Sequence, residues 1–186
     1  MGHHTFDPDR ADKLEDASQR YRYLSAEELV AALSTTGGDV IADLGSGTGF
    51  YTDDVAPHVD HLYGVDVQDA MHDYYHEKGV PDNVELITSG VEDLPFEDGQ
   101  LDAAFSTMTY HEFTSGDAIQ ELKRVLASGS RIVIADWSAH GGGESGPPLE
   151  ERFTVEEAAT ALREGGFDIQ SESTRPETFV IVGIRT

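Results

Sequence analysis

The residues with the clearest potential for ligand chemistry are two carboxylates placed around a run of alternating glycines. Asp43 precedes Gly45, Gly47 and Gly49 in the segment DVIADLGSGTGF, and Asp66 ends a second apolar run, LYGVDV. Glycine lets a backbone approach a ligand where a Cβ atom would collide. The first N–H groups of a following helix would lack partners within that helix. The segment therefore predicts a ligand cradle between a buried strand and a helix.

The glycine spacing helps to decide which ligand this cradle would hold. A dinucleotide site reads G-x-G-x-x-G and binds a pyrophosphate, whereas this chain reads G-x-G-x-G with Asp43 two residues before it. A carboxylate is a poor neighbour for pyrophosphate and a good one for an ammonium group, and Asp66 is placed to bind ribose hydroxyls. A ligand with an amino-acid tail, a ribose and no phosphate is S-adenosylmethionine. A tight turn that binds no ligand is the alternative.

Elements that would position these residues follow from apolar periodicity and from capping signals. An apolar stripe through Leu14, Ala17, Tyr21 and Leu24 predicts a helical N-terminal segment, 1–34, and Ser25 with Glu28 predicts a cap for its second helix. Further helices are expected at 52–57, 68–78, 115–126 and 154–164, and strands at 40–44, 62–66, 83–89, 101–107, 131–137, 167–174 and 177–185.

Three stretches together resemble the class I S-adenosylmethionine-dependent methyltransferases. They are VIADLGSGTGFYT, YGVDV and VEDLPFEDGQLDAAFSTMTYHE, and the resemblance covers about 40–137. It is closest to the small-molecule branch that includes ubiquinone and menaquinone biosynthesis methyltransferases. The resemblance implies a Rossmann-like α/β fold with a doubly wound, seven-stranded, mostly parallel sheet whose last strand is antiparallel. One domain, 1–186, would consist of a helical cap, 1–34, over a core, 35–186.

The resemblance also implies a set of cofactor-binding positions for S-adenosylmethionine. These are Asp43, Gly45, Ser46, Gly47, Gly49, Asp66, Val67, Val91, Glu92 and Thr107. Related sequences usually read G-D-A-E-D-L-P-F where this chain reads SGVEDLPF, so Gly90 replaces an Asp that bonds the adenine amino group. We therefore expect backbone groups near Val91 and Glu92, or the Glu92 side chain, to recognise adenine.

Polar residues after the strand expected at 101–107 should line the acceptor side, since ligands bind beyond the carboxyl ends of parallel strands. His111 is the candidate general base because an unperturbed imidazole has a pKa near 6.5, and Tyr110 would assist it. A structural histidine that caps the next helix is an equal alternative. Tyr21, Tyr23 and Trp137 are candidate pocket residues, each with core packing as its alternative, and HGGGESGPP predicts a flexible linker or lid.

Charge and composition narrow the class of partner. The chain has 36 Asp and Glu against 12 Lys and Arg, for a net charge of -24, which disfavours nucleic acid because phosphate contacts need basic residues. An acidic coat of this kind is typical of halophilic proteins, with an ordinary acidic protein as the alternative. The resemblance implies a small-molecule acceptor. No membrane and a cytoplasmic location are expected, since no signal-peptide core or membrane-spanning run appears.

Other site chemistries are less well supported by the sequence. The chain has no cysteine, which excludes thiolate metal sites and a cysteine nucleophile. His72 and His76 have metal-ligand spacing, but no third ligand is near and we expect a solvated helix face and no metal site. A noncatalytic cofactor-binding protein, a nucleotide-dependent oxidoreductase, and a protein or RNA methyltransferase stay open as alternatives, the last disfavoured by charge.

Overall fold

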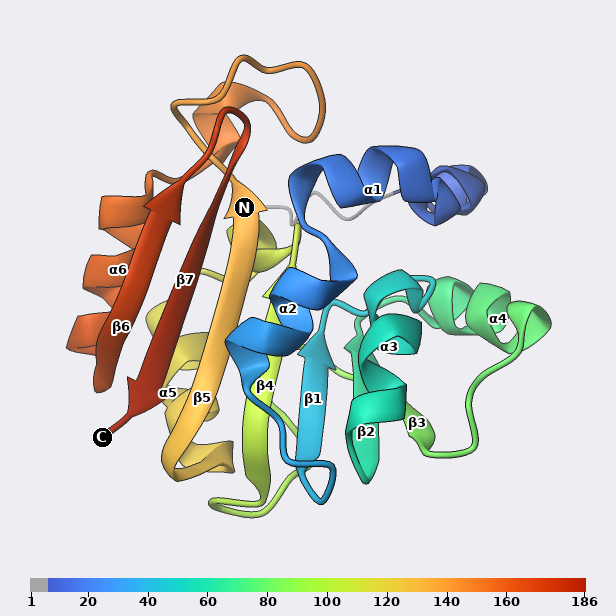
Figure 1. The fold of residues 1–186 in the computed structure, drawn as a ribbon, viewed down its shortest axis with the longest axis horizontal. Helices are drawn as coiled ribbons and strands as arrows, with labels where there is room; N and C mark the ends of the chain where they lie inside the picture. Colours follow the sequence, from blue (N-terminus) through green and yellow to red (C-terminus); the bar gives the residue numbers. More distant parts are fainter. Residues whose placement is uncertain (1–6) are drawn as a thin grey trace.

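A single seven-stranded sheet forms the centre of the protein, in the order β3-β2-β1-β4-β5-β7-β6 (Figure 1). The computed structural model describes residues 7–186, so the first six residues of the expected cap lie outside the described part. Strands β1 to β5 run parallel, and β7 is antiparallel to both of its neighbours. The strands are β1 (Val40–Leu44), β2 (His61–Asp66), β3 (Val84–Thr88), β4 (Leu101–Thr107), β5 (Leu126–Trp137), β6 (Phe167–Thr174) and β7 (Thr178–Arg185). The predicted fold class is confirmed.

Helices cover both faces of the sheet because alternate strand residues point to opposite sides. Ile41 and Val133 pack with α2 and α3, whereas Ala42 and Ile132 pack with α5 and α6. The α-helices are α1 (Ala17–Tyr23), α2 (Ala26–Leu33), α3 (Phe50–Val55), α4 (Asp69–Lys78), α5 (Gly116–Val125) and α6 (Val155–Glu164). Short 3₁₀ helices are η1 (Pro8–Glu15), η2 (Ala56–His58), η3 (Tyr110–Glu112) and η4 (Leu149–Glu151).

Capping side chains begin the helices where the sequence predicted them. The Ser25 hydroxyl oxygen accepts the Glu28 N–H at 3.2 Å at the start of α2. Thr154 and Glu157 form a reciprocal capping box at the start of α6. Each cap satisfies N–H groups that have no partner within the helix, which fixes where the helix begins.

Three details differ from the sequence-based expectation. Asp16 caps α1 by accepting hydrogen bonds from the N–H groups of Ser18 and Gln19. This cap separates α1 from η1, so the expected apolar stripe is not continuous, and Tyr21 is 41% exposed. Strand β5 begins directly where α5 ends, five residues earlier than expected. His72 is buried against Thr88, with 3.2 Å between Nδ1 and Oγ1, and does not lie on a solvated face.

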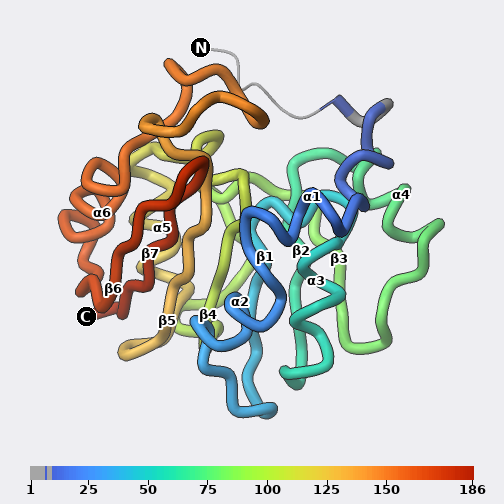
Figure 2. Tube along the Cα trace, turned by 45° about the horizontal axis from the view of Figure 1, so that its top comes forward, coloured from blue at the N-terminus to red at the C-terminus, as the bar shows by residue number. Residues whose placement is uncertain are grey.

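The chain reverses direction across the sheet between β1 and β4, which are neighbours although β2 and β3 come between them in sequence. In doubly wound sheets this switch point opens a crevice beyond the carboxyl ends of the strands. Figures 1 and 2 show α1 and the loop between β5 and α6 at that same end of the sheet. Within residues 7–186, no helix has the length and apolar character that a membrane crossing would require.

Candidate functional site

The loop after β1 is held by its own backbone bonds. The N–H groups of Gly45 and Ser46 both donate to the Val65 carbonyl oxygen, at 2.8 and 2.9 Å. The Gly47 N–H donates to Asp66 Oδ2 at 2.9 Å. A pyrophosphate cradle would need such N–H groups to point at the ligand. Because these three are already bonded within the protein, the loop suits a ligand without phosphate.

Two of the three alternating glycines are required by close packing. A Cβ atom on Gly45 would lie 2.3 Å from Thr109 Cγ2, and one on Gly49 would lie 2.1 Å from a ring carbon of Tyr75. Both residues have φ near +80°, a conformation that favours glycine. At Gly47 the nearest atom to such a Cβ is 3.6 Å away, on Leu14. Gly47 is therefore the position of the three with space for a ligand beside it.

Asp43 is a buried carboxylate with one oxygen available. The side chain lies at the end of β1 and is only 1% exposed. Its Oδ2 accepts the Thr52 hydroxyl at 2.7 Å, whereas Oδ1 has no hydrogen-bond partner. Burial raises the pKa of Asp43 to about 7, although the Thr52 hydrogen bond and the nearby charge of Arg20 act in the opposite direction. A ligand ammonium would supply both the missing partner and the compensating charge.

Asp66 and Val67 lie at the end of β2 in the arrangement that a nucleoside needs. The Asp66 carboxylate is fixed by two backbone donors, Gly47 on Oδ2 and Gln68 on Oδ1, each at 2.9 Å. Each ionised oxygen keeps acceptor capacity for a ribose hydroxyl. Val67 follows and is 53% exposed. A flat adenine ring would cover it.

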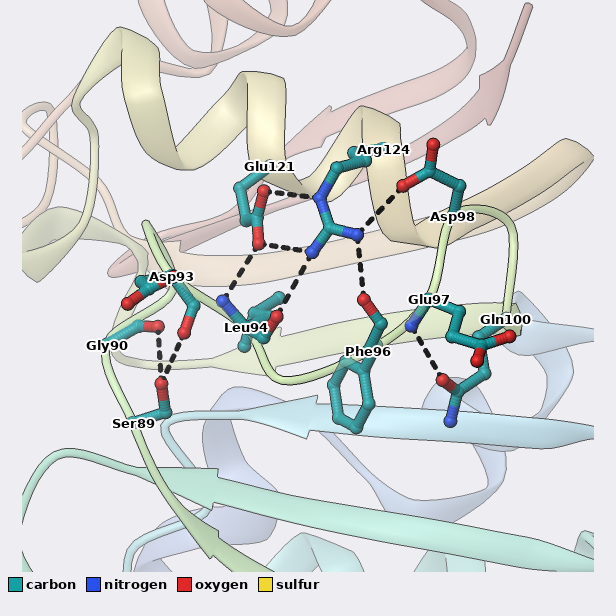
Figure 3. A network of polar contacts seen from close by, with 10 residues as sticks. All are labelled: Ser89, Gly90, Asp93, Leu94, Phe96, Glu97, Asp98, Gln100, Glu121 and Arg124. Atoms are coloured by element: carbon teal, nitrogen blue, oxygen red, sulfur yellow. Dashed lines mark hydrogen bonds and ion pairs between the residues drawn. The ribbon is translucent and has the colours of Figure 1, made fainter.

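The loop assigned to adenine recognition is clamped from α5 (Figure 3). Arg124 donates to the carbonyl oxygens of Leu94 and Phe96 at 3.1 and 2.7 Å, and Glu121 accepts the Leu94 N–H at 2.9 Å. Arg124 also bonds Glu121 at 2.6 and 2.8 Å. This clamp could not be predicted from the sequence, because Arg124 lies 30 positions from Leu94 and 28 from Phe96. The clamp fixes the loop that carries Val91 and Glu92.

Glu92 takes the space that a side chain at position 90 would occupy. A Cβ atom on Gly90 would meet the Glu92 carboxylate, with 2.5 Å to Oε1. Val91 beside it is buried in the core, and Glu92 itself is exposed. The Glu92 carboxylate therefore lies where the side chain of a residue at position 90 would begin.

Residues after β4 close the loop from the other side of the switch point. Thr107 is buried at the end of β4, and its carbonyl oxygen accepts the Thr109 hydroxyl at 3.2 Å. Met108 between them has φ of +61°, which is uncommon for a residue with a side chain. The Met108 N–H is fixed by the Ala135 carbonyl oxygen at 2.7 Å.

His111 forms a buried pair with Asp136. The ring Nδ1 of His111 lies 3.0 Å from both carboxylate oxygens of Asp136. The backbone N–H of His111 donates to Asp136 Oδ2 at 2.7 Å. Burial of the imidazole opposes protonation, but the hydrogen bond and charge of Asp136 outweigh it and raise the pKa of His111. Tyr110 packs into the core against Phe113 and Phe153, where burial raises its pKa to about 12.

A cleft of about 360 Å³ lies over the carboxyl ends of β4 and β5. Tyr23 and Trp137 line it, as proposed from the sequence, and their ring centroids are 4.7 Å apart. Tyr21 does not line it and instead bonds Asp54 at 3.0 Å. Tyr110 and His111 are not among the lining residues. These are Arg10, Lys13, Leu14, Gln19, Arg20, Tyr23, Tyr51, Met108, Trp137, Glu144, Ser145 and Gly146.

The loop between β5 and α6 forms one wall of this cleft and is held by a buried ion pair. Arg152 has a side chain that is 1% exposed and pairs with Glu177 at 3.5 Å. Arg152 donates to the carbonyl oxygens of Pro147, at 2.9 Å, and of Ser145. Glu177 accepts the Gly142 N–H at 2.6 Å. The segment expected as a flexible linker is therefore anchored, by partners too distant in sequence for its glycine-rich composition to reveal.

Comparison with known proteins identifies the family. A methyltransferase domain model matches residues 42–134, which is half of the chain. An uncharacterized methyltransferase of Geobacillus sp. (strain WCH70) is 24% identical and aligns over 93% of this chain and 78% of its own length. A demethylmenaquinone methyltransferase of Clavibacter sepedonicus is 32% identical over 58% of this chain, and the alignment spans 44% of that protein.

Among solved structures, an S-adenosylmethionine-dependent methyltransferase from Aquifex aeolicus superposes with a TM-score of 0.88. It is 28% identical, and the match covers 98% of this chain and 100% of that one. The orphaned oxygen of Asp43, the fixed carboxylate of Asp66 and the bonded glycine loop fit the same cofactor. The chain belongs to the methyltransferase domain family, and it is an S-adenosylmethionine-dependent methyltransferase.

Proposed function

We propose that the protein methylates a small-molecule acceptor, as members of the ubiquinone and menaquinone branch do. The observation that carries this proposal is the cleft of about 360 Å³, a volume typical of small-ligand sites. Leu14 lines this cleft and also lies beside Gly47 of the predicted cofactor loop. A net charge of -24 argues against a nucleic-acid acceptor. We further propose a cytoplasmic, halophilic protein: its acidic composition suits a cell that accumulates salt, and its sequence has no cysteine from which a disulfide could form.

In this proposal the cofactor lies across the carboxyl ends of β1 and β2. Asp43 holds the methionine ammonium, directly or through water, and Asp66 holds the ribose hydroxyls. Val67 covers one face of the adenine, and the loop of Val91 and Glu92 binds its edge. The remaining contacts are assigned to Gly45, Ser46, Gly47, Gly49 and Thr107. Support comes from the free Asp43 oxygen and from the 53% exposure of Val67.

The bound cofactor supplies a sulfonium methyl group, which is already a strong electrophile. The protein's work is then to align the acceptor with the S–CH₃ bond and to exclude water. We assign the acceptor's proton to His111 Nε2, because its Nδ1 faces Asp136 at 3.0 Å. His111 is not a lining residue of the cleft but follows Met108, which lines it, by three residues. Asp136 positions the imidazole, and Tyr110 supports the same turn through its packing against Phe113.

Two substitutions test the base assignment once an acceptor has been found by a metabolite screen with isotopically labelled methyl donor. His111→Ala should lower kcat by about 10²- to 10⁴-fold and leave cofactor affinity unchanged. Asp136→Asn should move the rise of kcat/KM to lower pH, because it removes the charge that raises the pKa of His111. Turnover that is unaffected by His111→Ala would exclude His111 as the base, and a screen in which only proteins or RNA are labelled would overturn the small-molecule proposal.

A further inference from the structure

Basic residues gather in the cleft of a strongly acidic protein. The chain contains 12 Lys and Arg against 36 Asp and Glu, yet Arg10, Lys13 and Arg20 all line this one cleft. They come from η1 and α1, and Figure 1 shows α1 at the end of the sheet to which the parallel strands point. Three of the twelve basic residues of this acidic protein therefore lie around one cleft, and their charges would favour an anion there.

Arg20 is the innermost of the three cations. Its guanidinium carbon lies 4.8 Å from the Tyr51 ring centroid and 5.4 Å from that of Phe50. Its Nε is buried and has no hydrogen-bond partner. Stacking on two rings fixes the plane of the guanidinium. The carboxylates of Asp43 and Glu15 lie near enough to favour its charged form, and Arg20 also lines the cleft in which an anion would bind. Arg10 and Lys13 are exposed at the mouth.

The other walls of the cleft are aromatic or apolar. Tyr23 lies edge-on to Trp137, and Leu14 and Met108 complete this side. Among the lining residues that the structure describes, Glu144 is the carboxylate, and its Oε2 lies 3.7 Å from the Arg22 guanidinium, so its charge is partly balanced. A ligand matched to these walls has a flat apolar body and a negative group at one end.

We propose that the methyl acceptor is an aromatic or similarly apolar compound that carries a carboxylate or phosphate, held by the cationic trio Arg10, Lys13 and Arg20. This inference rests on the proposed small-molecule function and deepens it. The anion binds the trio, and the apolar body lies against Tyr23, Met108 and Trp137. The bound anion orients the acceptor without taking part in the transfer.

Intrinsic fluorescence can report binding directly, because Trp137 is the only tryptophan of the chain and lines the cleft. The probes are 4-hydroxybenzoate, phenyl phosphate and the neutral isostere 4-hydroxybenzamide, each titrated into protein saturated with S-adenosylhomocysteine. At least one anion should quench Trp137 at millimolar concentration and bind about tenfold or more tightly than the amide. The tighter of the two anions identifies the acidic group as carboxylate or phosphate. No quenching by either anion, or equal binding of the amide, would overturn the proposal.

A double variant tests whether the positive charges bind the anion, without disturbing the fold. Arg10→Gln with Lys13→Gln should weaken anion binding by about fivefold for each charge removed, and both residues are exposed, so folding is preserved. Arg163→Gln on α6 is the matched control, since it removes one surface charge paired with Glu172 at the far end of the sheet. Unchanged affinity in the double variant would refute the role of these cations.

Competition separates the acceptor site from the cofactor site. If 4-hydroxybenzoate and S-adenosylhomocysteine displace each other, the cations serve the methionine carboxylate and the acceptor proposal is wrong. Failure of S-adenosylhomocysteine to bind would instead count against the cofactor site. The anion proposal would still be tested, because the affinities of the anion and of the amide can be compared in protein without S-adenosylhomocysteine.

Discussion

Binding of S-adenosylmethionine should release a proton from Asp43. In the free protein, burial raises the pKa of Asp43 to about 7. A ligand ammonium beside the unpartnered Oδ1 would lower that pKa, because an opposite charge favours the ionised carboxylate. If the bound pKa falls below 5, complex formation releases about 0.9 proton at pH 6 and about 0.5 proton at pH 7. The same linkage makes affinity rise about fivefold from pH 6 to pH 7.

The assay is isothermal titration calorimetry at each pH in two buffers of different ionisation enthalpy. S-adenosylhomocysteine should release the same number of protons, since it has the same amino-acid tail without the sulfonium charge. Adenosine, which lacks the tail, should release none. Asp43→Asn should abolish the release, because an amide has no proton to lose in this range. Proton release that persists in Asp43→Asn, or that adenosine also produces, would refute the reasoning.

Three further predictions concern packing, the adenine loop and salt. Gly49→Ala should destabilise the protein in urea unfolding by at least about 2 kcal/mol more than Gly79→Ala, because both have positive φ but only Gly49 faces Tyr75, at 2.1 Å; equal losses would contradict this. Arg124→Gln should weaken S-adenosylmethionine binding several-fold by releasing the clamp on Leu94 and Phe96, whereas unchanged affinity would show that the loop holds its shape alone. The melting temperature should rise from about 0.1 M to about 2 M KCl as salt screens the charge of -24; a flat or falling curve would argue for an ordinary acidic protein.

The sheet and the cofactor loop could be predicted because their signals are local. Buried strands such as β1 are continuous apolar runs, and the spacing of Gly45, Gly47 and Gly49 with Asp43 stands within a few residues. The anchoring of the loop after β5 could not be predicted, since Arg152 and Glu177 are 25 positions apart and pair only in the folded chain. The burial of His72 depends in the same way on its contact with β3.

The basic residues that line the cleft were only partly predictable from the sequence. Arg10, Lys13 and Arg20 are close in sequence, but the apolar stripe predicts one continuous helix through this segment. The break at Asp16 between η1 and α1 changes the helical phase, so the residues that face the cleft could not be read from a single period.

One calorimetric comparison tests the phosphate-free nucleoside site most directly. We expect S-adenosylmethionine to bind the protein with one-to-one stoichiometry, NAD not to bind, and Asp66→Asn to lower the affinity for S-adenosylmethionine at least about tenfold, through loss of carboxylate bonds to the ribose. Binding of NAD, or full affinity for S-adenosylmethionine in Asp66→Asn, would contradict the site described.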